Sequence, residues 1–220
     1  MAETAKTNEI KKRPYGEETR TKILDAAEQI FAERGFASTS TREIGRLAGM
    51  DKYAIYYHFK NKESLYRAVI ERSFSKITGF IDGVFPQEVV SLKELERVFE
   101  KILEYMAQNS AIMKIMQRES LDCTNVGIAE TFQKYFKPLY RKGIRFSQAG
   151  KKGGVFKEEM HARQFIISLY TLIMSYYNDG AMISLLLGED VLSKRMIRER
   201  KSQLAKFVMD NLAPGVNRTG

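Results

Sequence analysis

Apolar residues recur every three or four positions along most of the chain, which is the pattern of amphipathic α-helices. Between residues 18 and 34, Ile23 and Ala27 fall on one helical face, and Gly35 follows as a left-handed C-cap with Phe36 placed to close over it. No convincing strand pattern occurs, and only four prolines interrupt the chain. The pattern therefore predicts an all-α fold.

Two short helices are expected directly after the first. Ser40 and Glu43 have the spacing of a capping box, in which a hydroxyl and a carboxylate satisfy each other's orphan amides. Gly49 tolerates positive φ and ends the helix, and the carboxylate of Asp51 suits the N-cap of the next one. Two helices joined by such a tight turn, with a supporting helix before them, have the form of a helix-turn-helix, whose second helix enters the major groove of DNA. The two helices are expected at 41–48 and 51–59.

The second of these helices divides its side chains between two faces. Ile55 and the phenylalanine four residues later face the core, whereas Lys52, Tyr53 and Tyr57 emerge on the opposite side. An exposed phenol can bond a phosphate oxygen or a base edge while its ring contacts a thymine methyl group. We therefore expect a DNA-reading surface here. Packing of a small helical domain is the alternative for these tyrosines, and for Tyr56 the two readings have equal weight.

The remainder of the chain is also predicted to be helical. Asn61 caps a helix that runs toward Phe80, Ser91 and Glu94 repeat the capping-box spacing, and GKKGG at 150–154 is the clearest long turn. Further helices are expected at about 91–108, 110–120, 125–147, 158–178 and 190–211.

Charge and composition limit the classes of binding partner and the cellular compartment that we expect for this protein. The chain has 36 Lys and Arg against 27 Asp and Glu, a net charge of +9, which favours an anionic partner such as nucleic acid, acidic lipid or an anionic small molecule. The single cysteine, Cys123, excludes an internal disulfide, and the N-terminus lacks the apolar core of a secretory signal. The most apolar segment, 165–177, is shorter than the roughly 20 residues of a membrane span. We expect a cytoplasmic protein with no membrane partner.

No catalytic or metal-binding constellation stands out. Glu158 and His161 have the Glu-x-x-His spacing of helical di-iron sites, but such sites need a second copy, and the other histidine, His58, lies in the expected DNA-reading helix. AGKKGG lacks the spacing and the Ser or Thr of a phosphate-binding loop, and neither Gly-x-Ser-x-Gly nor His-Glu-x-x-His occurs. The sequence predicts no enzyme, no metal site and no cofactor.

The segment TRTKILDAAEQIFAERGFASTSTREIGRLAGMDKYAIYYHFKNKESLYRAVI, residues 19–70, closely resembles the N-terminal DNA-binding domain of the tetracycline-repressor (TetR) family. Its specific parts are IFAERGF, TREI, LAG and IYYHFKNKESL. The resemblance implies an all-helical homodimeric regulator, a repressor rather than an activator, without enzymatic activity. It also implies a variable C-terminal ligand domain, and a ligand that lowers affinity for a palindromic operator.

Matched position by position, the family motif implies which residues contact DNA. These are Thr41 and Arg42 at the start of the second helix, Lys52, Tyr53 and Ala54 in the base-reading turn, Tyr56, Tyr57 and His58 as groove and phosphate contacts, and Lys62 as a phosphate clamp. Members often have a small residue or proline where Tyr53 stands, Ser or Thr where Ala54 stands, and alanine where Gly45 stands. A bulky Tyr53 and a hydroxyl-free Ala54 imply an operator read more through ring and methyl contacts than through hydrogen bonds.

The expected organisation is a disordered basic tail (1–16), a helix-turn-helix domain (17–75), a larger ligand-binding and dimerisation domain (76–213) and a disordered end (214–220). The basic run Lys11–Arg13 is expected to be solvated, with an arm in the minor groove as the alternative.

Three groups of residues in the larger domain carry functional predictions. An inducer pocket, or else an unliganded core, is expected from Met106, Met113, Met116, Phe132, Phe136, Tyr170, Met174 and Tyr177. A four-helix dimer interface, or else an intramolecular core, is expected from Phe165, Leu169, Leu172, Ile173, Tyr176, Met196, Leu204, Phe207 and Val208. Lys134, Lys137, Arg141 and Arg145 form a stripe on one helix face that is either solvated or holds an anionic group of a hydrophobic ligand.

The predicted function is a ligand-responsive homodimeric repressor of a double-stranded DNA operator, released by a small hydrophobic or amphipathic inducer. Two recognition helices must meet half-sites about one DNA turn, roughly 34 Å, apart, which requires a dimer. The alternatives are a helical carrier or sensor of hydrophobic molecules with vestigial DNA binding, and a weakly specific architectural DNA binder.

Overall fold

The computed structural model describes residues 16–88, 91–121 and 126–213. These residues form ten α-helices and no strand, so the predicted all-α fold is confirmed for the described part of the chain. The run Lys11–Arg13, Cys123 and residues 214–220 lie outside the described residues. The helices are α1 (Glu17–Arg34), α2 (Thr41–Ala48), α3 (Lys52–His58), α4 (Lys62–Val84), α5 (Leu92–Gln108), α6 (Ser110–Leu121), α7 (Val126–Lys152), α8 (Ala162–Asn178), α9 (Gly180–Leu187) and α10 (Lys194–Leu212).

Local sequence signals set the ends of the short helices as predicted. The hydroxyl of Ser40 accepts a hydrogen bond from the Glu43 N–H at 3.2 Å, and the Glu43 carboxylate accepts one from the Ser40 N–H at 3.1 Å. Gly49 ends α2 in the left-handed conformation (φ 66°, ψ 31°), and Asp51 caps α3 by accepting from the Ala54 N–H at 2.7 Å. Because these bonds satisfy the orphan amides, both helices end cleanly and meet in a tight turn.

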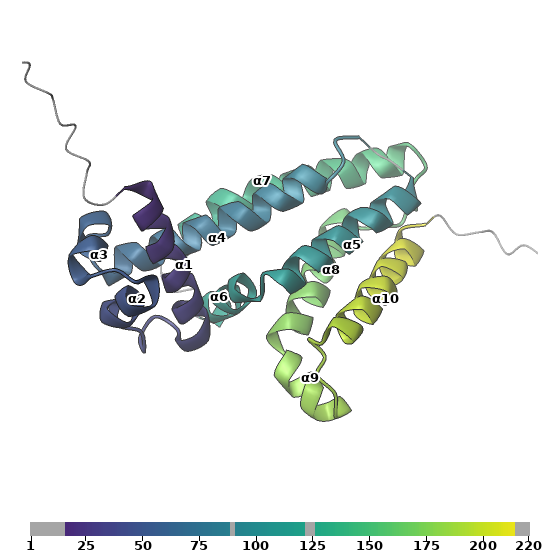
Figure 1. Ribbon diagram of the computed structural model, residues 1–220. Helices are drawn as coiled ribbons and strands as arrows, with labels where there is room; N and C mark the ends of the chain where they lie inside the picture. Colours follow the sequence, from purple (N-terminus) through teal and green to yellow (C-terminus); the bar gives the residue numbers. More distant parts are fainter. Residues whose placement is uncertain (1–15, 89–90, 122–125, 214–220) are drawn as a thin grey trace, which may run out of the picture.

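The first three helices gather at one end of the molecule (Figure 1). From there α4 leads into the helical body and runs beside α7, while α10 packs along α5. Arg72 of α4 forms ion pairs with Asp25 and Glu28 of α1, each at 2.7 Å. The body also contacts this end through α6, which lies against α1. One continuous apolar core joins the two regions in the described part of the chain.

The long helix α7 contains a proline in its interior. Pro138 has no N–H, so the carbonyl of Lys134 loses the donor that would complete an intrahelical hydrogen bond. On either side of this position α7 is tied to α4: Lys134 lies 3.3 Å from Glu71, and Lys142 lies 2.7 Å from Asp82.

The turn between α7 and α8 begins and ends later in the chain than the sequence predicted. The helix continues to Lys152, into the GKKGG segment, and α8 starts at Ala162 rather than near residue 158. The chain folds back so that Phe156 packs against α7 at Gly150, where an added Cβ atom would lie 2.1 Å from the ring. The close approach therefore requires glycine at position 150.

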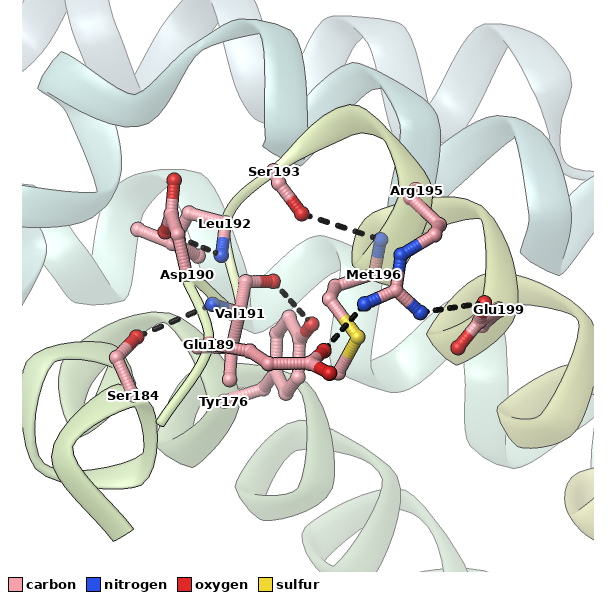
Figure 2. A network of polar contacts seen from close by, with 10 residues as sticks. All are labelled: Tyr176, Ser184, Glu189, Asp190, Val191, Leu192, Ser193, Arg195, Met196 and Glu199. Carbon is pink, nitrogen blue, oxygen red and sulfur yellow. Dashed lines mark hydrogen bonds and ion pairs between the residues drawn. The ribbon is translucent and has the colours of Figure 1, made fainter. Parts of the chain in front are cut away.

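The sequence pattern did not predict α9. Its eight residues, GAMISLLL, are nearly all apolar, so no alternation of apolar and polar faces marks a helix. A polar network holds the corner between α8, α9 and α10 (Figure 2). In it the Tyr176 hydroxyl donates to the Val191 carbonyl, and the Val191 N–H donates to the Ser184 hydroxyl at 3.1 Å. Arg195 pairs with both Glu189 and Glu199, which fixes the start of α10 against the end of α9.

None of the helices in the described residues combines the length and the apolar composition that a membrane span needs.

Candidate functional site

The exposed face of α3 is rich in aromatic rings, as the sequence indicated. Tyr53 is 81% exposed, and Tyr56 and Tyr57 are also exposed, while Ile55 is buried in the core beneath them. The ammonium of Lys52 lies 5.4 Å from the centre of the Tyr56 ring, a cation–π contact that places a positive charge beside the rings. Arg42 of α2 is exposed as well. The helix thus presents phenols and cations together to solvent.

Ala54 does not lie on this face. Its side chain has no exposed surface and belongs to the apolar core. The expectation that Ala54 reads a base is therefore corrected: in this structure its methyl group packs the core. The resemblance marked its position in the motif, whereas the direction of its side chain follows from the register of α3.

Lys62 also has a role that the sequence did not indicate. Its ammonium donates to the carbonyls of Phe36 and Thr39 at 2.8 and 3.0 Å and lies 4.2 Å from the centre of the Phe36 ring. These contacts brace the turn between α1 and α2, so at least two of the three N–H donors are used within the protein. One N–H donor of the ammonium is not used by these two bonds, so the phosphate contact expected of Lys62 stays a prediction.

Thr41 and His58 occupy partly covered positions at the edges of the helix-turn-helix. Thr41 is the first residue of α2, and His58 is the last residue of α3. The ring of His58 meets the Tyr57 ring edge-on at 5.1 Å, and its buried Nε2 atom has no hydrogen-bond partner among the described residues. Between the two helices, Gly45 is closely packed, since a Cβ atom there would lie 2.8 Å from the Met50 carbonyl oxygen.

The junction between the helix-turn-helix and the body is polar. The hydroxyl of Tyr66 in α4 donates to the carboxylate of Glu119 in α6, and Arg118 donates to the main-chain carbonyl of Glu33 in α1 at 3.0 Å. Burial raises the pKa of the Tyr66 phenol, and the bond to Glu119 raises it further, so the hydroxyl stays protonated and remains a donor. Met116, one turn before Glu119, belongs to the wall of an internal cavity, so α6 reaches from that cavity to the junction.

That cavity has a volume of about 650 Å³ and lies among α4, α5, α7 and α8. Its size is within the range of pockets for drug-sized ligands, about 300–1,000 Å³. Of the residues expected in a ligand pocket, Met106, Met116, Phe132, Phe136, Tyr170 and Met174 line it. Met113 is buried elsewhere in the core. Tyr177 faces a separate small cavity, where its hydroxyl donates to the Leu103 carbonyl at 3.1 Å.

Other parts of the cavity wall were missed by the sequence prediction. From α4, α5 and the turn after α7 they include Ile77, Ile81, Leu95, Phe99, Ile102 and Phe156. Their three- and four-residue spacing marked them as buried, but nothing in the pattern distinguishes a cavity wall from a packed core. Three residues expected at the dimer interface, Phe165, Leu169 and Ile173, also line the cavity.

The other expected dimer residues are divided between core and surface. Leu204 and Val208 are buried within one chain, on a helix that packs along α5, so they have no surface left for a partner and the expectation is corrected for them. Tyr176 and Met196 lie in the polar corner of Figure 2, and Leu172 is partly covered against the core. Phe207 alone of this set is exposed. The helix α9 also carries exposed apolar side chains, namely Met182, Leu185, Leu186 and Leu187.

Within the described residues, no three His, Cys, Asp or Glu side chains lie close enough together to hold a metal ion. Glu158 lies in the turn before α8, and His161 is the residue that precedes this helix. The Glu-x-x-His spacing therefore falls outside a helix in this structure.

A model of the tetR family of bacterial regulatory proteins matches residues 23–69, and a model of a tetracyclin repressor-like C-terminal domain matches residues 92–208. The HTH-type transcriptional regulator AcrR of Shigella flexneri is 43% identical over 120 residues, 53% of this chain and 55% of AcrR. The HTH-type negative transcriptional regulator IcaR of the biofilm operon icaADBC in Staphylococcus epidermidis is 23% identical over 129 residues, 54% of this chain and 70% of IcaR. The match thus spans about half the length of AcrR.

Among solved structures, the transcriptional regulator FadR from Bacillus subtilis in complex with stearoyl-CoA aligns with a TM-score of 0.69 and 18% identity. The alignment covers 88% of this chain and 99% of FadR. At this identity the comparison shows a shared fold.

Proposed function

Since the chain belongs to the TetR family, it is a helix-turn-helix transcriptional regulator, and we propose that it is a homodimeric repressor which a mainly apolar small molecule releases from a palindromic operator. As a member of this family the chain is a regulator and not an enzyme. The observation that carries the DNA-binding part of the proposal is the exposed aromatic and cationic face of α3. This face lies on the surface of the chain, with Tyr53 81% exposed, and suits the major groove.

The contacts that we assign to DNA follow from exposure. Tyr53, Tyr56 and Tyr57 supply ring and hydroxyl contacts, and Arg42 and Lys52 supply charge to the backbone. Ala54 is buried and is not part of the proposed contact set. Lys62 remains in the set as a phosphate contact, through the N–H donor that its two bonds to carbonyls leave unused. The operator is thus read mainly by rings.

Dimerisation is proposed through the exposed apolar residues at the far end of the body. Two identical half-sites require two copies of the chain, and a patch of exposed leucines marks a protein contact. Leu185 and Leu186 of α9 are the strongest candidates, because each is about four-fifths exposed and α9 is held firmly by the network of Figure 2.

The ligand site that we propose is the cavity among α4, α5, α7 and α8. Its wall is almost wholly apolar, and FadR, which shares the fold, was solved with stearoyl-CoA, a molecule with a long apolar chain. Two helices connect this cavity to the helix-turn-helix. Ile77 and Ile81 of α4 and Met116 of α6 line it, so a ligand that displaces either helix changes the position of α3.

The test is a selection of tight binders from a pool of random DNA duplexes at one near-physiological salt concentration. An enriched inverted repeat establishes a dimeric sequence-specific regulator and supplies its operator. Salt-sensitive binding without enrichment contradicts the proposal and favours a carrier or an architectural DNA binder. The purified protein is first extracted and examined for a bound apolar molecule that would hold it off DNA.

A further inference from the structure

The interior of the cavity offers a ligand no unpaired polar group among the described residues. The Ser147 hydroxyl donates to the Gly143 carbonyl within α7 at 2.8 Å. Lys142 points its ammonium to Asp82, donating to the carboxylate at 2.7 Å and to the main-chain carbonyl at 3.3 Å. A polar group on the buried part of a ligand would therefore lose its water without gaining a partner, at a cost in binding free energy. The buried part must be apolar.

The cavity opens between α7 and α8. Most of its lining residues are buried or half-buried, and every lining residue that is exposed lies on one of these two helices. We call these residues the α7–α8 mouth: Phe132, Gln133, Lys137, Tyr140, Ile167 and Tyr170. When a ligand enters through this opening, the end that enters last stays at the α7–α8 mouth, in contact with water.

The charge at the mouth is positive. Residues 131–157 contain eight Lys and Arg and no Asp or Glu, and α8 also contains no acidic residue. Two of the eight, Lys134 and Lys142, pair with carboxylates of α4. Lys137 belongs to the mouth, and Arg141 lies four residues further along α7 and so on the same face. Within the described part of the chain, neither has a carboxylate at ion-pair distance, so both are available to a ligand.

We propose that the cavity takes an amphiphile with one long apolar chain and an anionic headgroup, and that Lys137 and Arg141 hold this headgroup at the α7–α8 mouth. The apolar wall receives the chain, and the two cations neutralise the end that remains in water. This inference rests on the proposed function, because it takes the cavity as the ligand site of the regulator. It adds that the ligand carries a negative charge and that this charge lies at the α7–α8 mouth.

The experiment compares two fluorescent probes that differ only in charge: parinaric acid, a conjugated long-chain fatty acid, and its uncharged methyl ester. Both are titrated into the full-length protein at neutral pH, where probe fluorescence rises on entry into an apolar cavity. The sequence contains no Trp, so tryptophan emission does not interfere. We expect the acid to bind about tenfold more tightly than the ester, a gain that falls as salt is added.

The variants are Lys137→Met, Lys137→Glu and the double change of Lys137→Glu with Arg141→Glu. Each variant is expected to lower the affinity for the acid, by about tenfold or more for the double change. The affinity for the ester is expected to stay within about twofold of the parent's. Lys93→Glu is the control, because it makes the same charge change at an exposed position at the start of α5, away from the mouth. Since all of these side chains are exposed, the variants are expected to fold.

The proposal is overturned if the acid and the ester bind with equal affinity, or if Lys137→Glu lowers the affinity for both probes equally. Either result would indicate an uncharged, apolar ligand for the regulator. Failure of both probes to bind overturns it as well, and the duplex selection then decides separately whether the chain is a sequence-specific regulator. Competition against the bound acid separates two sources of the same chemistry. Palmitate displaces it if a carboxylate suffices, and only palmitoyl-coenzyme A displaces it if the headgroup is a phosphate-rich thioester carrier.

Discussion

The hydroxyl of Tyr66 donates a hydrogen bond to the carboxylate of Glu119, and this bond joins α4 of the helix-turn-helix region to α6 of the body. The next residue back on α6, Arg118, donates to the Glu33 carbonyl of α1 at 3.0 Å. Two neighbouring side chains of one helix thus hold two helices of the DNA-binding end. Because Met116 on the same helix lines the cavity, the junction lies one turn from the proposed ligand.

Replacing Tyr66 with Phe keeps the ring that packs edge-on against Phe31 at 4.7 Å and removes the hydrogen bond. We expect the free energy of unfolding to fall by about 1.5–3 kcal/mol, the range for a hydrogen bond to a charged group. Urea denaturation of Tyr66→Phe, Glu119→Ala and the double variant gives the coupling energy between the two side chains, because each single change removes the hydrogen bond. Arg67→Gln, which breaks an exposed pair with Glu63 on α4, serves as the control. Strictly additive effects of the two changes would contradict the assigned bond.

Two residues of α3 that lie two positions apart are expected to differ in what their substitution changes, DNA affinity for one and stability for the other. Tyr53→Ala should lower affinity for the selected operator about tenfold or more and change the free energy of unfolding by less than about 0.5 kcal/mol, because the ring is exposed. Ile55→Ala should lower the free energy of unfolding by about 2–5 kcal/mol, because the side chain is buried. DNA titration and urea denaturation measure both quantities for each variant. A Tyr53→Ala protein that binds the operator like the parent would remove this ring from the contact set.

Two glycines in helices should respond oppositely to alanine. Gly79 in α4 has no atom within 4 Å of an added Cβ, so Gly79→Ala should raise the free energy of unfolding by about 0.5–1 kcal/mol through helix propensity. Gly150→Ala should lower it by about 1–3 kcal/mol despite the same propensity gain, because the new methyl group displaces the buried Phe156 ring. Thermal melts of the two variants beside the parent are sufficient. Stabilisation by both changes would show that Phe156 does not pack on α7.

The exposed leucines of α9 should control the oligomeric state. Leu185→Glu combined with Leu186→Glu is expected to convert a dimer into a monomer while helical content stays constant, because both side chains lie outside the core of one chain. Sedimentation measures the change, and far-ultraviolet circular dichroism checks the fold. Lys93→Glu again controls for added negative charge. A dimer that persists in the double variant would place the interface on other helices.

The stability of the protein should fall at alkaline pH through a buried phenol. Burial raises the pKa of Tyr177 to about 12, above the unfolded value of about 10. Below pH 10 the phenol is protonated in both states and its contribution is complete. Between pH 10 and 12 the unfolded state loses the proton first, so stability falls by up to about 1.4 kcal/mol per pH unit from this group.

The measurement is urea denaturation of the parent and of Tyr177→Phe across this pH range. The stability advantage of the parent should shrink as the pH rises, because the variant has no proton to lose at this position. Tyr53→Phe removes an exposed phenol and is the matched control. Parallel pH profiles for the parent and Tyr177→Phe would contradict the assignment.

The features that the sequence predicted correctly depend on neighbours within a few residues. The capping pairs of Ser40 with Glu43 and of Ser91 with Glu94 form as expected, because each involves one helix turn. The inward direction of Ile55 and the outward direction of Tyr53 follow from helical periodicity in the same way.

What escaped prediction depends on distant parts of the chain. Leu204 and Phe165 are equally apolar, yet one is buried in the α10 region of the core and the other lines the cavity. Their surroundings are set by how α5, α7 and α8 come together, and the periodicity of a single helix carries no information about this. Lys62 is a similar case, since its partners lie 23 and 26 residues earlier in the chain.

Pro138 has a mechanical consequence for the cavity. A helix that bends at an ordinary residue must stretch or break a hydrogen bond, whereas α7 can bend at Pro138 without that loss, because the bond to the Lys134 carbonyl is already missing. The ties of Lys134 to Glu71 and of Lys142 to Asp82 lie one turn to either side and hold both arms of α7 on α4. The part of the cavity wall that carries Phe136 and Lys137 lies between these two ties, so it can change shape to admit ligands of different width.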